Sequence, residues 1–186
     1  MRVYEKLLSD MTPVLRQGRP GDSAHIKSAF ANAQRFCKRG VHNPRVLFPA
    51  VILHDIGFGL LRRQFIPLVA GGKKSKELTH SITGVSSAYA AHLLPSYGFT
   101  PDEIKAIRFC LEYGDEETLS VKNPPAEMVM LHDLNFLDRF FPHRVRVARI
   151  NRTSEQLREI LNKSLAAILS QEIKEEAKRR YASLKI

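Results

Sequence analysis

The chain has 186 residues, of which 44% are hydrophobic and 26% are charged. These proportions are close to those of soluble globular proteins, so they exclude a wholly disordered chain. The longest apolar stretches, residues 46–53 and 88–94, are too short to cross a bilayer, which needs about 20 residues. The N-terminal residues lack the apolar segment of a secretory signal. We therefore expect a cytoplasmic protein that does not associate with membranes.

The formal net charge of +10 is distributed unevenly along the chain. Residues 101–138 carry a net charge of −6, whereas residues 144–186 carry +6, and residues 56–76 contain five cations and no acid. Basic segments suit phosphate-bearing substrates, nucleic acid or an acidic partner, and they can also be solvated surface. No signature of an RNA-binding domain or a zinc finger accompanies the charge, which makes nucleic acid the less favoured partner.

Apolar residues recur with the 3.6-residue period of helices along most of the chain. Thr100 precedes Pro-Asp-Glu and Thr153 precedes Ser-Glu-Gln, and both sequences are typical helix starts. The helix that begins at Thr153 is expected to be long, with its apolar stripe reaching Ile173. The other predicted helices span residues 22–40, 46–55, 78–94, 100–114 and 126–141.

No segment shows the alternating pattern of a β-strand, so the sequence predicts an all-α protein. We expect a compact helical bundle with a long C-terminal helix. Residues 1–20 are predicted to pack on the core as an N-terminal helix, residues 21–143 to form the main domain, and residues 144–186 to form a basic helical extension. Two cysteines without CxxC spacing indicate free thiols.

Histidine and aspartate interrupt the apolar patterns of three predicted helices. His54 and Asp55 end the apolar run 46–53, His25 lies on the preceding helix, and Asp133 lies within the run 128–137. Burying such groups costs several kcal/mol unless something compensates for the lost hydration. A divalent cation is an efficient compensator, because imidazole and carboxylate groups can share one ion. Together these residues predict an inward-facing metal site.

The order His25, His54-Asp55 within Leu-His-Asp-Ile-Gly, and Asp133 resembles the H…HD…D motif of the HD-domain superfamily of metal-dependent phosphohydrolases, over residues 23–141. The resemblance implies an HD-type helical bundle and an enzyme. It implies that His25, His54, Asp55 and Asp133 bind one divalent ion, with Mn, Fe, Co, Ni, Mg and Zn all open. Water activated by that ion would cleave a phosphomonoester or phosphodiester bond in a small phosphorylated substrate, expected to be a nucleotide.

Under this resemblance the catalytic residues are His54, Asp55 and His80, the last being similar to a further histidine that many members place after the HD pair. Tyr113 stands where two-metal members usually carry another histidine, which favours a single ion. A loop rich in lysine precedes His80 and could hold substrate phosphates, although a solvated lysine run is equally compatible with it. The candidate phosphate-binding residues are Lys73, Lys74, Lys76 and His80.

The last metal ligand has two possible registers. Alignment on Leu137-Asp138 places Asn135, not Asp133, at the ligand position of the family motif. Residues two apart in a helix point about 200° away from each other, so the two side chains cannot serve equally. We expect Asp133 to be the ligand because a carboxylate neutralises the ion. Asparagine at that position would indicate weakened metal binding or lost activity.

Two other classes of function stay open. The chain could be a degenerate HD module that binds a ligand or partner without turnover, as Tyr113 and Asn135 suggest. It could also be a basic protein that binds nucleic acid or an acidic partner through residues 144–186. The amphipathic C-terminal segment also leaves a homodimer open.

Overall fold

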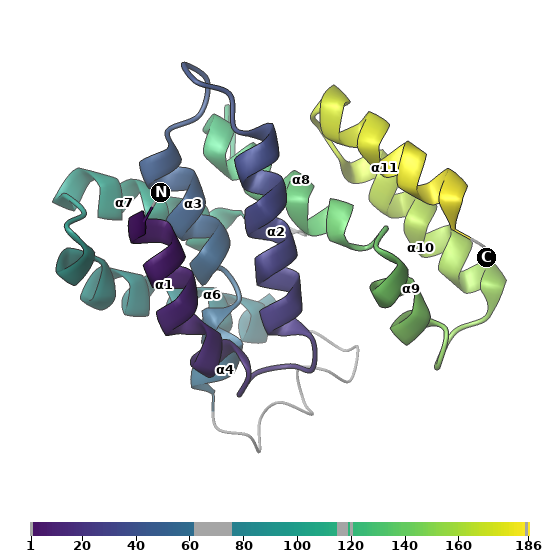
Figure 1. Cartoon of the computed structure of the whole chain (residues 1–186), viewed down its shortest axis with the longest axis horizontal. Helices are drawn as coiled ribbons and strands as arrows, with labels where there is room; N and C mark the ends of the chain where they lie inside the picture. Colours follow the sequence, from purple (N-terminus) through teal and green to yellow (C-terminus); the bar gives the residue numbers. More distant parts are fainter. Residues whose placement is uncertain (1, 62–75, 115–118, 120, 185) are drawn as a thin grey trace.

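The computed structural model describes residues 2–61, 76–114, 119, 121–184 and 186, without the side chains of residues 76–80. All regular structure in these segments is helical, which confirms the all-α prediction (Figure 1). None of these helices is long and apolar enough to span a membrane. The helices are α1 (Arg2–Leu15), α2 (Asp22–Phe36), α3 (Pro44–Leu53), α4 (Ile56–Leu60), α6 (Lys76–Leu93), the 3-10 helix η2 (Leu94–Tyr97), α7 (Pro101–Tyr113), α8 (Ala126–Asp138), α9 (Pro142–Ala148), α10 (Ser154–Ala167) and α11 (Gln171–Ser183).

Helix α3 lies at the centre of the bundle. Every residue from Val46 to Leu53 is buried, and helices α1, α2, α7 and α8 pack around it. A helix that is apolar on all sides is stable only when neighbouring helices cover all of them, because exposure costs about 25 cal/mol per Å² of apolar surface. This packing fixes the end of α3, and with it the adjacent residues His54 and Asp55, inside the protein.

Helices α7 and α10 begin as the sequence predicts. The Thr100 hydroxyl accepts a hydrogen bond from the Glu103 backbone N–H, and the Glu103 carboxylate accepts one from the Thr100 backbone N–H. Thr153 and Gln156 form the same reciprocal pair at α10. Each reciprocal pair is a capping box, in which two backbone N–H groups at the start of the helix find acceptors that they would otherwise lack.

The prediction of one long C-terminal helix is wrong, because the chain bends between α10 and α11. Ile168 is extended, with φ −65° and ψ 124°, and its side chain is fully buried. The N–H groups of Leu169 and Ser170 donate hydrogen bonds to the carboxylate of Asp133 on α8. Burial of Ile168 and these two bonds stabilise the break, which periodicity along the sequence does not reveal.

The two C-terminal helices lie against α8 and share the main hydrophobic core (Figure 1). Leu157 and Leu161 of α10 and Ile173 of α11 are all buried in it. Glu176 of α11 also forms ion pairs with Arg35 of α2 and Arg180. Residues 144–186 therefore contain helices that complete the core.

Candidate metal centre

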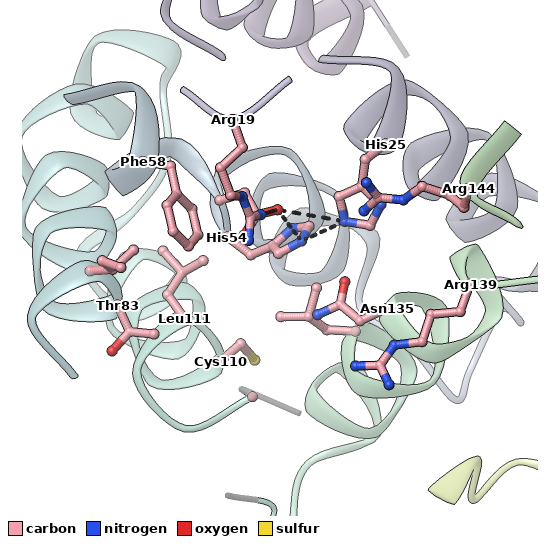
Figure 2. Close-up of a pocket in the computed structure, with 14 residues that line it drawn as sticks. Arg19, His25, His54, Phe58, Thr83, Cys110, Leu111, Asn135, Arg139 and Arg144 are labelled. Atoms are coloured by element: carbon pink, nitrogen blue, oxygen red, sulfur yellow. Dashed lines mark hydrogen bonds and ion pairs between the residues drawn. The ribbon is translucent and has the colours of Figure 1, made fainter. Parts of the chain in front are cut away.

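Three potential metal ligands converge beside the buried end of α3. His25 comes from α2, and His54 and Asp55 occupy the turn between α3 and α4. The two Nε2 atoms are 3.1 Å apart, and Asp55 Oδ2 lies 3.7 Å from His25 Nε2 and 3.6 Å from His54 Nε2 (Figure 2). For three atoms at these separations one point lies roughly 2.0 Å from each, a normal distance for histidine and carboxylate ligands of a transition metal. The cluster can therefore hold one ion.

The turn that carries His54 and Asp55 is held by close contact with α6. The Gly57 N–H donates a hydrogen bond to the Ser86 hydroxyl, which donates to the His54 carbonyl oxygen. A Cβ on Gly57 would lie 2.5 Å from the Ile82 carbonyl oxygen, so only glycine fits there without displacing backbone. The close contact between this turn and α6 therefore depends on Gly57 in the Leu-His-Asp-Ile-Gly segment and on the small residue Ser86 in α6.

The hydrogen-bonding of His54 directs a lone pair into the cluster. Its Nδ1 lies 2.8 Å from the Val51 carbonyl oxygen, which can only accept, so Nδ1 donates and Nε2 is left unprotonated in the neutral ring. Burial lowers the pKa of His54, which maintains this neutral form. A neutral imidazole with a fixed tautomer is the form that binds a metal ion.

His25 has a different environment on the side of the ring away from the cluster. Its Nδ1 lies 2.9 Å from Oδ2 of Asp138, a carboxylate that is only 2% exposed and also accepts a hydrogen bond from Arg144 Nε at 2.6 Å. Burial disfavours the charged ring, but Asp138 and Asp55 outweigh it and raise the pKa of His25. With His54 Nε2 only 3.1 Å away, either a proton or a cation is needed between the two rings.

Arg19 connects the loop before α2 to the cluster. Its guanidinium donates to Asp55 Oδ2 at 2.5 Å and to Asp22 Oδ1 at 3.0 Å, and it stacks on the Phe58 ring. Burial, together with the nearby Asp55 charge, raises the pKa of Asp22 to about 6 despite the arginine. The positive charge of Arg19 therefore offsets the repulsion between the carboxylates of Asp22 and Asp55.

Asn135 of α8 faces the same cavity as the three clustered residues (Figure 2). Its side-chain amide points toward the two histidine rings, and its Oδ1 atom is buried without a hydrogen-bond partner among the described residues. A buried carbonyl oxygen without a partner costs about 1–3 kcal/mol. An ion bound by His25, His54 and Asp55 would give this oxygen a partner, so the residues present fit a metal ion.

Asp133, predicted as the fourth ligand, is not part of this cluster, and that prediction is wrong. Its fully buried carboxylate accepts hydrogen bonds from the N–H groups of Leu169 at 2.9 Å and Ser170 at 2.7 Å, and His132 Nδ1 lies 3.1 Å away. Burial opposes ionisation, but these donors outweigh it and lower the pKa of Asp133. The carboxylate holds the bend between α10 and α11, on the side of α8 away from the histidines.

The cluster opens into a cavity of about 110 Å³. Three arginines line it, Arg19 from the α1–α2 loop and Arg139 and Arg144 from the end of α8 and from α9. The motif and the helix patterns in the sequence predict no role for these arginines or for Asp138. The signal for them in the sequence is the group of ionisable residues, Asp138, Arg139 and Arg144, around the end of the predicted helix 126–141.

Of Tyr113 and the four predicted phosphate-binding residues, only Tyr113 has a described side chain. Tyr113 is 42% exposed at the end of α7. Lys73 and Lys74 lie outside the described residues, as do the side chains of Lys76 and His80. The proposed lysine loop thus stays a prediction, as does a catalytic role of His80.

No family model, no curated protein and no solved structure matches this chain. Fold and geometry define an all-α protein with a His–His–Asp cluster at the end of its central helix. The cluster has the ligand types and spacing for one divalent ion, and it opens into a cavity lined by arginines.

Proposed function

We propose that this protein is a metal-dependent phosphohydrolase of the HD-domain type, acting on a small phosphate ester. The observation that carries the proposal is the convergence of His25, His54 and Asp55 on one cavity with the amide oxygen of Asn135, which has no hydrogen-bond partner in the described part of the chain. These residues match the H…HD part of the family motif, and Asn135 replaces its final aspartate. Four protein ligands leave two positions of an octahedral ion open for water and substrate.

Each residue has a distinct part in the proposed reaction. His25, His54, Asp55 and Asn135 would hold the ion, which when bound polarises a phosphoryl oxygen and lowers the pKa of a bound water. Asp138 keeps the His25 ring oriented from its far side. Arg139 and Arg144 supply positive charge next to the ion, where a phosphoryl group gains negative charge during the attack of water.

A module that binds metal or ligand without turnover is the second candidate. Asn135 is a neutral ligand, and the Asp55 carboxylate is already paired with Arg19 at 2.5 Å. Both features lower the affinity for a divalent ion below that of a site with two unpaired carboxylates. This candidate predicts substoichiometric metal and no hydrolysis of phosphate esters.

The test combines metal content with turnover. Elemental analysis of tag-free protein, as purified and after incubation with Mn²⁺, should give about one equivalent of ion. The same protein should release phosphate from a panel of phosphomonoesters and diesters. The variant His54→Ala should lose both ion and activity while remaining folded by circular dichroism.

The control variant is His92→Ala, which removes an exposed histidine of α6 outside the cavity and should keep both properties. Full activity of folded, metal-free His54→Ala protein would refute the proposal. One equivalent of ion with no hydrolysis across the panel would favour the binding module.

A further inference from the structure

Arg144 of α9 reaches the metal centre through a buried carboxylate. Resting on the metal centre of the function proposed above, we propose that Arg144 is a positioning residue: it fixes the carboxylate of Asp138, which in turn fixes the ring of His25 as a ligand. This role is separate from the charge that Arg144 supplies beside a phosphoryl group. It makes the start of α9 part of the metal centre.

The two ring nitrogens of His25 have different surroundings. Nε2 lies in the cluster, 3.1 Å from Nε2 of His54, whereas Nδ1 lies 2.9 Å from Oδ2 of Asp138 and has no other polar partner among the described residues. An ionised carboxylate can only accept, so the neutral ring carries its proton on Nδ1 and directs the lone pair of Nε2 into the cluster. Asp138 therefore selects the tautomer of His25 that binds an ion.

The orientation of the Asp138 carboxylate depends on Arg144. The Arg144 Nε–H donates a hydrogen bond at 2.6 Å to Oδ2, the same oxygen that faces His25, and Oδ1 is buried without a hydrogen-bond partner in the described part of the chain. A carboxylate rotates easily about its last torsion, because that torsion has broad minima. Two donors on one oxygen hold it in place, and without Arg144 only the contact with His25 would remain.

Arg144 is itself well placed for this contact. It lies in the first turn of α9, and the next residue, Val145, is buried in the main core and anchors the helix. The side chain extends toward the His25 ring (Figure 2). It also passes the start of α2, since a Cβ added to Gly21 would lie 3.8 Å from its Nη1 atom. The end of α8 and the starts of α9 and α2 thus meet at one guanidinium.

Two simpler roles of Arg144 give different measurable results. If its ion pair with Asp138 only joined α9 to α8, a substitution would lower the free energy of unfolding and leave the affinity of the folded protein for an ion unchanged. If Arg144 acted only through its charge, its removal would tighten the binding of a cation, because like charges repel. A positioning role predicts weaker binding.

The test is Mn²⁺ binding to the full chain, measured by titration calorimetry. Arg144→Gln should weaken binding by about tenfold, the lower end of the loss that follows removal of an outer partner of a metal ligand. Arg144→Lys keeps the charge without the Nε–H group and should also weaken binding. Asp138→Ala should weaken it by about tenfold, and the double variant by about tenfold as well, instead of the roughly hundredfold expected of independent effects.

The matched control is Arg146→Gln, which removes the same charge from an exposed position of the same helix and should leave the affinity unchanged. Urea unfolding of the metal-free variants measures their stability separately. Nitrogen NMR of the histidine rings in Zn²⁺-loaded wild type should show the Nδ1 proton on His25 and on His54, whose Nδ1 faces the Val51 carbonyl oxygen. Arg144→Gln should shift the signals of His25 and leave those of His54 in place.

Mn²⁺ binding to Arg144→Gln that equals or exceeds that of the wild type overturns the inference. Additive losses in the double variant, a proton on Nε2 of His25 in the Zn²⁺-loaded wild type, or absence of Mn²⁺ binding to the wild type would overturn it as well. Its failure is distinguishable from that of the proposed function. Weaker ion binding by Arg144→Gln, with no ester hydrolysed by the wild type, keeps the positioning role and removes the enzyme. Hydrolysis by the wild type, with unchanged ion binding by the variant, keeps the enzyme and removes the positioning role.

Discussion

Replacing Asp133 by alanine separates a structural carboxylate from a metal ligand. In the structure this side chain is fully buried and accepts two backbone hydrogen bonds, from Leu169 at 2.9 Å and Ser170 at 2.7 Å. The substitution removes both acceptors and the carboxylate that lies 3.1 Å from His132 Nδ1. It should therefore loosen the bend between α10 and α11 while leaving the His25–His54–Asp55 cluster intact.

The expected loss of stability follows from the number of bonds. A hydrogen bond to a charged group is worth about 1.5–3 kcal/mol, and the Asp133 carboxylate accepts two of them from backbone N–H groups. We expect Asp133→Ala to lower the free energy of unfolding by about 3–5 kcal/mol, a large fraction of the 5–15 kcal/mol that is typical of a domain. Asp133→Asn keeps one acceptor and should lose about half as much.

The assay is urea unfolding of metal-free protein followed by circular dichroism, with metal content measured on the folded variant. Because the pKa of Asp133 is lowered in the folded state, its stabilisation is present above the unfolded pKa of about 3.9 and is lost as the pH falls through the lower folded value. The difference between wild type and variant should be constant from pH 6 to 8 and shrink below about pH 4. Wild-type stability combined with loss of the ion would show instead that Asp133 is a ligand.

Three further substitutions test other parts of the structure. Asn135→Asp should tighten Mn²⁺ binding by on the order of tenfold in titration calorimetry, because a carboxylate adds a charge to the ligand set, and unchanged affinity would show that residue 135 does not reach the ion. Gly57→Ala should destabilise the protein by about 1–3 kcal/mol in thermal melts, because its Cβ would lie 2.5 Å from the Ile82 carbonyl oxygen. Gly84→Ala, where a Cβ meets no atom within 4 Å, is the matched control and should not destabilise. Burial raises the pKa of Asp22 to about 6, so its contribution is most favourable below the unfolded pKa of about 3.9 and is lost as the pH rises through about 6. Metal-free wild type should therefore lose roughly 2–3 kcal/mol relative to Asp22→Asn between pH 4 and 7, and parallel stability curves would contradict the shifted pKa.

The helices could be predicted where their signals are local. The boxes at Thr100 and Thr153 and the small-residue helix α6 depend on residues within a few positions of each other. The bend at residues 168–170 depends on Asp133, more than 30 residues earlier, and so no periodicity analysis could find it. An apolar stripe that continues through Ile173 is compatible with one helix or with two helices packed on the same neighbour.

The same contact decides which residue of α8 enters the site. His25, His54 and Asp55 could be predicted because the motif places them at the ends and faces of apolar helices. Asp133 and Asn135 differ by about 200° around α8, and both faces of this helix are covered, one by the histidines and the other by the C-terminal pair. The sequence shows that both positions are polar in an apolar helix, but not which neighbour covers which face.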